Sequence, residues 1–301
     1  MSVLLVGSIA IDNIITQHHR ADNILGGSAS FCGVAVGLFE RALLVGVVGE
    51  DFPGEYIELF RKNNIDLQGL EVVKGGKTFT WTGKYKENFN ERETLDIQLN
   101  TFADFHPRIP EVYMQSKFLM LGNIQPGLQL EVLKQVRNPD FIMADTMDLW
   151  INTDRKELDK LISQINCLVL NDSEASLYTG HNNIIRAARS IQKAGPEIVI
   201  IKKGSHGAML FNGNSIFSAP AYPLEDVKDP TGAGDSFAGA SMGYLASQGR
   251  VTDELLRKAV VYGTVIASYT VSEFSLKGID CLPREAINQR YSGIKAMTLF
   301  Q

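Results

Sequence analysis

Short runs of apolar residues, each about the length of a buried β-strand, recur along the chain. They lie between turn residues at positions 3–6, 43–48, 118–121, 141–144, 167–170 and 198–201. Helical patterns separate most of them, for example at 127–136, 154–165 and 183–193. This alternation predicts an α/β protein with a mainly parallel sheet covered by helices on both faces. Ligands are then expected beyond the carboxyl ends of the strands.

Two segments, 78–85 and 93–100, show a different pattern, because apolar and polar residues alternate in them. The aromatic members of the first segment are Phe79, Trp81 and Tyr85. A period of two predicts strands with one exposed face. Together with residues 11–16 they are expected to form a small antiparallel sheet. The pattern leaves open an edge hairpin of the main sheet, a lid over a binding site, or a surface that pairs with a second subunit.

No internal repeat, low-complexity tract or linker divides the 301 residues, so residues 1–301 are predicted to form one domain. Segments at roughly 11–17 and 66–104 are expected to be inserted in this domain as a lid.

Composition narrows the class of protein. With 45% hydrophobic and 21% charged residues, the chain can bury a sizeable core, and its net charge of -5 argues against nucleic acid or an anionic membrane as partner. The apolar runs are too short to span a bilayer, and no basic region precedes an apolar segment at the N-terminus. The three cysteines, Cys32, Cys167 and Cys281, lack metal-binding spacing and are predicted to be buried thiols of a cytoplasmic protein.

The segment 229–236, Asp-Pro-Thr-Gly-Ala-Gly-Asp-Ser, is the strongest candidate for chemistry. Gly232, Ala233 and Gly234 have little side-chain bulk, so an anion can approach the main chain closely. The pattern of 235–248 predicts a helix, whose free N–H groups at the start would add to an anion site. Asp235 at that start is placed to accept a proton from a substrate hydroxyl. An ordinary glycine-rich turn before a helix would show the same residues.

Three further segments carry candidate residues, each with a structural alternative. Gly26 and Gly27 precede a predicted helix and allow either close ligand approach or a tight turn. The segment 171–174, Asn-Asp-Ser-Glu, follows a strand and has the form of a helix capping box. A third segment, Lys202 with the glycine loop 204–207, also follows a strand. The lysine could contact a phosphate there, or it could be a solvated charge.

Two other patterns are rejected. The segment 75–78, Gly-Gly-Lys-Thr, ends like a P-loop but has Glu71 at the required leading glycine, and a strand rather than a helix follows it. The five histidines lack the HExxH spacing of zinc hydrolases.

The segment 229–237 resembles the C-terminal signature of the ribokinase-like (PfkB) family of carbohydrate and nucleoside kinases, which is close to D-x-T-G-A-G-D-x-F. The matching residues are Asp229, Thr231, Gly232, Ala233, Gly234, Asp235 and Phe237. The resemblance implies a three-layer α/β/α fold with a central, mainly parallel sheet and a small β lid. It also implies transfer of the ATP γ-phosphoryl group to a sugar hydroxymethyl group. Asp235 would be the base, and the amides of 232–234 would be the anion hole.

The resemblance extends to an acceptor site at the N-terminal end of the chain. Asp12 corresponds to the acceptor-binding Asp of the family, and Gly26 and Gly27 correspond to its N-terminal glycine pair. Where relatives often have an Asn that meets sugar hydroxyls, this chain has Phe31, with Ser30 as the nearest polar residue. A nucleoside is the alternative acceptor to a sugar, since Phe31, Phe79, Trp81 and Trp150 are candidates to stack on a base. A metabolite-binding relative without catalysis is the alternative of a different class.

The resemblance also implies cofactor sites. Asn171 and Glu174 match the N-x-x-E motif that positions Mg²⁺-bound water near the phosphates. For ATP, it assigns Gly204 and Gly207 to the nucleotide loop, together with Lys202 and Thr231. Asp229 resembles a position that binds a monovalent cation such as K⁺ in relatives. The resemblance runs from Gly7 to about Thr270 and gives no role to the residues after Lys277.

Overall fold

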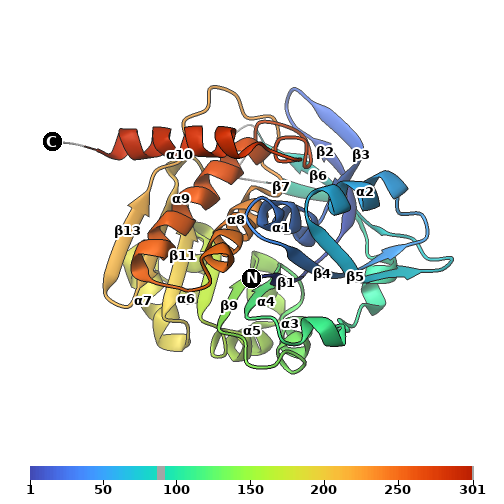
Figure 1. Ribbon diagram of the computed structural model, residues 1–301, viewed down its shortest axis with the longest axis horizontal. Coiled ribbons are helices and arrows are strands. Elements are labelled where there is room, and N and C mark those ends of the chain that lie inside the picture. The colour runs from blue at the N-terminus through green and yellow to red at the C-terminus, as the bar shows by residue number, and fades with distance from the viewer. Residues whose placement is uncertain (87–91, 300–301) are drawn as a thin grey trace.

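The computed structural model describes residues 1–86 and 92–299 and shows a nine-stranded sheet between two layers of helices (Figure 1). In spatial order the strands are β13 (Ser215–Ala219), β12 (Ala208–Asn212), β11 (Ile198–Lys202), β10 (Cys167–Asn171), β9 (Phe141–Asp145), β8 (Phe118–Leu121), β1 (Val3–Val6), β4 (Ala42–Gly49) and β5 (Ile65–Val73). The strands from β11 to β5 pair in parallel, and β12 and β13 add two antiparallel strands at one edge. The predicted three-layer architecture is confirmed.

Each face of this sheet is covered by its own group of helices, because its strands are buried on both faces. One group consists of α1 (Ser28–Gly37), α2 (Gly54–Lys62), α8 (Ala233–Gln248), α9 (Asp253–Thr270) and α10 (Arg284–Thr298). The other consists of α3 (Pro126–Leu133), α4 (Asp148–Thr153), α5 (Arg155–Ile162), α6 (Asp172–Thr179) and α7 (Ile184–Ala194). Short 3₁₀ turns lie at η1 (Asn100–Asp104), η2 (Glu111–Tyr113) and η3 (Gly204–His206).

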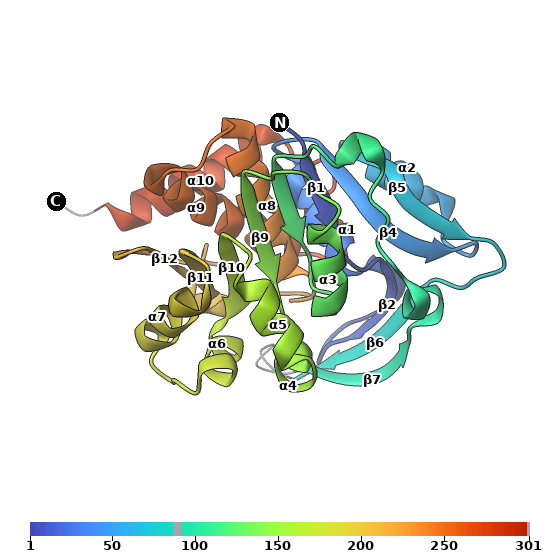
Figure 2. The same ribbon diagram turned by 90° about the horizontal axis from the view of Figure 1, so that it is seen from below.

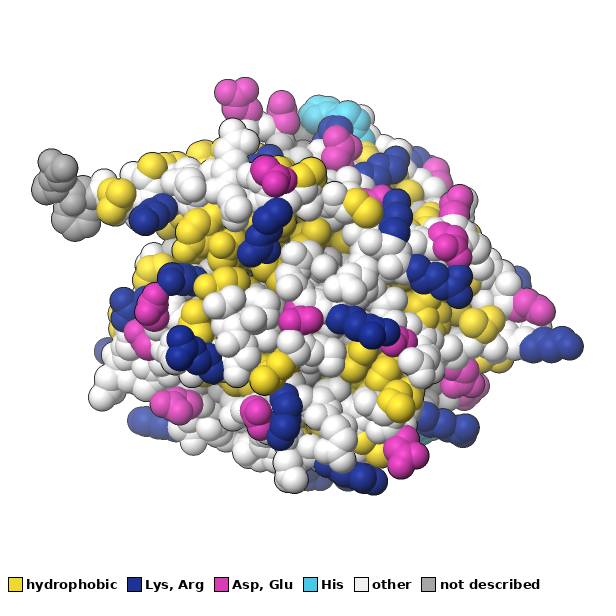
Figure 3. Space-filling model, in the orientation of Figure 1, with side chains coloured by type: hydrophobic (Ala, Val, Ile, Leu, Met, Phe, Trp, Pro, Cys, Tyr) yellow, Lys and Arg dark blue, Asp and Glu magenta, His cyan; other side chains and the backbone are white. Residues whose placement is uncertain are grey.

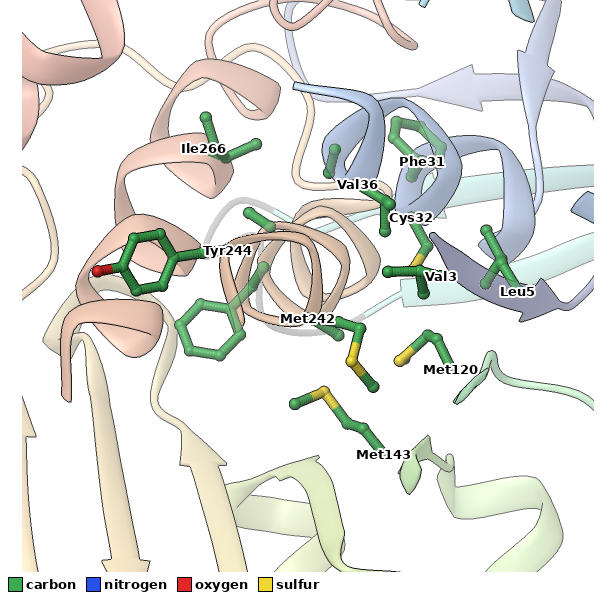
Figure 4. Close-up of a cluster of buried hydrophobic side chains, with 14 of the residues drawn as sticks. Val3, Leu5, Phe31, Cys32, Val36, Met120, Met143, Met242, Tyr244 and Ile266 are labelled. Atoms are coloured by element: carbon green, nitrogen blue, oxygen red, sulfur yellow. The ribbon is translucent and has the colours of Figure 1, made fainter. Parts of the chain in front are cut away.

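Helices α1 and α8 pack unusually closely, and this contact positions the candidate site. A Cβ atom on Gly239 would lie 2.4 Å from the Cys32 carbonyl oxygen, and one on Gly243 would lie 2.9 Å from Val36 Cα. Glycine at both positions lets the two backbones meet. Below them, Met242 of α8 reaches Met120 and Met143 of the sheet, while Phe31 and Cys32 of α1 flank α8 (Figure 4). The start of α8 is therefore held against the start of α1.

A second sheet of four strands projects from the first, next to the carboxyl ends of the central strands (Figure 2). Its order is β3 (Arg20–Gly26), β2 (Ala10–Ile15), β6 (Phe79–Tyr85) and β7 (Arg92–Gln98). The prediction of an antiparallel sheet is corrected, because β2 and β6 pair in parallel. The predicted lid segment 66–104 also begins too early, because β5 at 65–73 belongs to the large sheet.

Other predictions have clear outcomes. The segment 75–78 leads into strand β6, so it is not a P-loop. Cys32 and Cys167 are buried, but the prediction for Cys281 is wrong because its side chain is exposed. In the described part of the chain, no helix is both long and apolar enough to cross a membrane. Acidic and basic side chains are interspersed over the face shown in Figure 3.

Candidate functional site

Polar side chains from separate elements meet beyond the carboxyl ends of the central strands. Asp145 and Lys202 are the last residues of β9 and β11, and Lys202 Nζ lies 3.3 Å from Asp145 Oδ2. The charge of Lys202 also interacts with Glu174 of α6 and with Asp235 of α8. Asp12 of β2 interacts with Asp235 from the side of the second sheet. The two sheets and the start of α8 therefore enclose one polar site.

The glycine turn before α8 has the geometry of an anion nest. Gly232 has a φ of 74°, in the left-handed region that favours glycine, and α8 begins at Ala233, two residues earlier than predicted. The Ala233 amide donates to the Pro230 carbonyl at 3.2 Å. Helix geometry gives the amides of Gly234 and Asp235 no intrahelical acceptor. The Asp235 amide interacts with its own carboxylate, so the Gly234 amide is the N–H group that best suits an anion.

The Asp235 carboxyl group has an altered acidity. Its burial raises the pKa to about 7, with a further increase from Asp145, although the charges of Lys202 and Arg92 lower it. A general base works best when its pKa is close to the operating pH. Asp235 therefore has the acidity that proton abstraction from a hydroxyl requires.

Lys202 lies directly at the nest. A Cβ atom on Gly234 would lie 2.8 Å from Lys202 Nζ, so the ammonium group contacts this glycine. Burial lowers the pKa of Lys202, but the charges of Asp145, Glu174 and Asp235 outweigh it and raise the pKa overall. The lysine is therefore charged, and it lies at the start of α8 while paired with Asp145.

Asp145 is a site residue that the sequence analysis missed. Its carboxylate pairs with Lys202, and its Oδ1 accepts a hydrogen bond from the Thr146 amide at 2.9 Å. The available signal was its place at the carboxyl end of a buried strand, since Asn171 and Lys202 were recognised at the ends of β10 and β11.

The predicted acceptor residues lie together next to the nest. The Asp12 carboxylate packs on Gly26, where a Cβ atom would lie 1.9 Å from Oδ2. Gly27 has a φ of 90°, and the Phe31 ring packs on Gly232, where a Cβ atom would lie 2.3 Å from it. The Ser30 hydroxyl is buried and donates to the Gly26 carbonyl at 2.6 Å. The Ser30 hydroxyl thus donates its hydrogen to the backbone.

Burial of Asp12, together with the charges of Asp229 and Asp235, raises its pKa to about 8. Because the unfolded chain ionises this group near its ordinary value of 3.8, the folded state loses stability as the pH rises from about 4 to about 8. We therefore expect Asp12→Asn to raise the free energy of unfolding at pH 8, on the order of a few kcal/mol, and by much less at pH 4.

Urea unfolding at several pH values measures the difference in the free energy of unfolding between Asp12→Asn and the wild type. Asp104→Asn, at an exposed position of η1, is the matched control for the change of one carboxylate to an amide. If the stability gained in Asp12→Asn stays constant or shrinks as the pH rises, the Asp12 carboxyl group does not have the raised pKa that its burial predicts.

Asn171 and Glu174 form the predicted capping box at the start of α6. Asn171 Oδ1 accepts from the Glu174 amide at 2.8 Å, and Glu174 Oε2 accepts from the Asn171 amide at 2.7 Å. Burial raises the pKa of Glu174 to about 7, against the charge of Lys202. Within 1–86 and 92–299, no group of three His, Cys, Asp or Glu residues is arranged to hold a metal ion. Sparse oxygen donors of this kind suit Mg²⁺ that keeps most of its water.

Asp229 has the features of a cation ligand. Its Oδ1 accepts from the Thr231 amide at 2.9 Å. Burial raises the pKa of this carboxylate, and the Ser275 amide, which also interacts with it, lowers the pKa. A buried carboxylate needs compensating partners, and a small cation at this position would add to these two amides.

The glycine loop after β11 has the backbone geometry expected of it. Gly204 and Gly207 have φ angles of 52° and 82°, and the Lys203 amide donates to the Gly207 carbonyl at 2.7 Å. A Cβ atom on Gly207 would lie 2.0 Å from the Ala219 carbonyl oxygen, so this position requires glycine. The loop is compact and lies at the end of the strand that supplies Lys202.

The second sheet contacts the nest through Tyr85, which was predicted only as a strand residue. Its hydroxyl lies 3.0 Å from Thr231 Oγ1, and its side chain is 7% exposed. Arg92, opposite Tyr85 on β7, adds a positive charge that acts on Asp235 and Glu174. The second sheet therefore closes over the residues at the start of α8.

Comparisons with known proteins agree with this geometry. Residues 2–280 match the family model described as pfkB family carbohydrate kinase. The chain is 29% identical to a cytidine kinase of Thermococcus kodakarensis over 85% of this chain and 92% of that protein. It is 28% identical to the ribokinase of Mus musculus over 83% of this chain and 80% of that protein.

Solved structures show the same fold at low identity. The aminoimidazole riboside kinase of Salmonella enterica, complexed with aminoimidazole riboside and an ATP analogue, has a TM-score of 0.78 and 19% identity. The alignment covers 97% of this chain and 100% of that one. A putative ribokinase II of E. coli in complex with ATP and Mg²⁺ has a TM-score of 0.80 and 18% identity, over 97% and 99% of the two chains.

Proposed function

Because the chain belongs to the pfkB family of carbohydrate kinases, it is a phosphotransferase, and we propose that it transfers the γ-phosphoryl group of ATP to a primary hydroxyl of a sugar or nucleoside. Asp235 is the proposed general base. The observation that carries this proposal is the position of its carboxyl group, with a pKa of about 7, in the first turn of α8 beside the Gly234 amide.

The proposed reaction assigns a task to each part of the site. Asp235 accepts the proton of the acceptor hydroxyl as the hydroxyl oxygen bonds to the γ-phosphorus, and the bond from this phosphorus to the bridging oxygen of ADP breaks. The Gly234 amide and the Lys202 ammonium group would face the charge on the phosphoryl oxygens. Phosphoryl transfer depends mainly on such positioning and charge stabilisation. Lys202, which the sequence also indicated as a candidate phosphate contact, would supply the positive charge beside this amide.

Two metal sites belong to this proposal. Asn171 and Glu174 would hold Mg²⁺ through water, and the ion would neutralise charge on the phosphates. Through its buried carboxylate, Asp229 would bind a monovalent cation such as K⁺ next to Thr231. Gly204, Gly207 and Thr231 remain the residues that we propose to contact ATP.

A screen of acceptors tests the proposed function. Purified protein, ATP and Mg²⁺ are incubated separately with ribose, fructose, cytidine and inosine, and ADP release is followed together with the mass of the product. We expect saturable ADP release for at least one acceptor and one phosphorylated product per ADP. Saturable binding of an acceptor without ADP release would instead support a metabolite-binding protein that lacks catalysis.

We also propose that the second sheet pairs with its counterpart in another copy of the chain. Strand β7 is at the edge of this sheet and is exposed along its whole length. Leu95, Ile97 and Leu99 on and next to it are 48%, 49% and 45% exposed. An exposed edge strand with apolar side chains is a template for pairing with another strand.

Sedimentation velocity tests this surface. We expect the wild-type chain to sediment as a dimer and the double variant Leu95→Glu, Leu99→Glu to sediment as a monomer, because two buried charges would oppose the contact. Val112→Glu is the control, since Val112 is 70% exposed in η2, away from β7. A wild-type monomer, or a dimer that persists in the double variant, would contradict the proposed surface.

A further inference from the structure

Trp81 lies on the face of the second sheet that is turned toward the nest. Residues on one face of a strand alternate, so Trp81, Gly83 and Tyr85 of β6 share a face. Asp12 of β2 is in register with Trp81 and belongs to the same face. The charge of Asp235 acts on Asp12, and Tyr85 contacts Thr231. Trp81 is thus the neighbour of the proposed acceptor carboxylate across two paired strands, and it shares a face with the residue that contacts the nest.

The neighbours of Trp81 hold its ring flat against the strand. A Cβ atom on Gly83 would lie 2.1 Å from the indole Cη2, so the ring covers this glycine. The indole Nε1 donates to Thr94 Oγ1 at 3.1 Å, and Thr94 is opposite Gly83 on β7. One face of the ring therefore lies on the backbone of Gly83, and the other is directed away from the sheet.

Two of the other aromatic residues near the site are engaged with the protein. The Phe31 ring is 1% exposed and packs on Gly232. Phe79 stacks on Phe102 with ring centroids 5.4 Å apart. Trp81 is only partly buried, and the Arg92 guanidinium lies 5.9 Å from its ring centroid. An indole that is fixed, flat and partly exposed is the form of surface on which a planar group stacks.

We propose that Trp81 is the stacking platform of the acceptor site and that the acceptor is a nucleoside, with its base on the indole and its sugar hydroxyls at Asp12. This inference rests on the proposed function, since it names the acceptor class of the same site. It gives Gly83 a role as well, because any side chain there would displace the ring from its position.

Steady-state kinetics with cytidine, inosine and ribose test the platform. Aromatic stacking of a base is strong enough that Trp81→Ala should raise KM for a nucleoside by about 10- to 100-fold. The KM for ATP should change by less than about threefold. Trp81→Phe should restore most of the nucleoside affinity, because a smaller aromatic ring still offers a face. An equal loss for ribose and nucleosides, or no loss for nucleosides, would overturn the proposal.

Fluorescence provides a readout that is independent of turnover. The chain has two tryptophans, so Trp150→Phe leaves Trp81 as the single fluorophore and Trp81→Phe leaves Trp150. We expect cytidine and inosine to quench the emission of Trp81, while ribose has little effect. A nucleoside response that is confined to Trp150 would overturn the assignment.

These results separate the inference from the proposed function. If no acceptor releases ADP, the proposed function fails, and the emission of Trp81 still decides whether a nucleoside stacks on it. If sugars alone are phosphorylated and Trp81→Ala is neutral, the kinase function stands and the inference is overturned. ADP release with nucleosides and a selective loss in Trp81→Ala support both.

Discussion

Asp235→Asn is expected to lower kcat by about 10²- to 10⁴-fold, the usual scale for the loss of a general base. The amide is nearly the same size as the carboxylate but cannot accept the proton of the acceptor hydroxyl. The phosphate contacts that we assign to Gly234 and Lys202 do not require this carboxylate. We therefore expect the affinity for ATP, measured by equilibrium binding, to change by only about threefold or less.

The pH dependence of the same reaction gives an independent readout. Because the pKa of Asp235 is raised to about 7, the base is protonated below this pH, and kcat/KM of the wild-type enzyme should fall on the acidic side. Asp235→Asn should lose this acidic limb along with the activity. Asp253→Asn is the control, because Asp253 occupies the first turn of α9, away from the site. Turnover near the wild-type level in Asp235→Asn would refute the role of the base.

Gly232→Ala is expected to impair both folding and catalysis. A Cβ atom at this position would lie 2.3 Å from the buried ring of Phe31, and the φ of 74° is unfavourable for alanine. Overpacking and backbone strain together should lower the free energy of unfolding by about 2–4 kcal/mol. Since relief of the clash moves the start of α8 and its amides, kcat should fall by about 10²-fold.

Gly249→Ala is the control that introduces backbone strain at the other end of α8 without displacing the nest. Gly249 ends the same helix with a φ of 65°, and the nearest atom to a Cβ there is on the flexible Met1 side chain at 3.4 Å. This variant should lose about 1 kcal/mol of stability by urea unfolding and keep its kcat. If Gly232→Ala retained kcat within about threefold of the wild-type value, the nest would have no part in catalysis.

The sequence predicted the parts of the fold that depend on local pattern. Buried parallel strands such as β1 and β10 are continuous apolar runs, so their positions were recognised to within a residue. Strand β3 was missed because Arg20, Asp22 and Asn23 make it polar, and its pairing with β2 is what makes it a strand. The parallel pairing of β2 with β6 depends on how distant segments meet, which periodicity does not encode.

In the candidate site, too, the sequence revealed local motifs but not contacts between distant segments. The nest could be recognised because its glycines and Asp235 are adjacent in sequence. Asp145 and Tyr85 escaped recognition because their partners are distant: Asp145 pairs with Lys202, and Tyr85 contacts Thr231 across 146 residues. Single residues after a strand, or within a lid strand, carry no local pattern that distinguishes them from ordinary polar positions.

A crystal structure of the complex with a non-hydrolysable ATP analogue and a phosphorylatable acceptor tests the central claim most directly. The account predicts that the primary hydroxyl lies about 2.6–3.2 Å from an Asp235 oxygen and that the γ-phosphate contacts the amides at the start of α8. A triphosphate bound away from these amides, or a hydroxyl that faces another group while Asp235 remains in an ion pair, would contradict it.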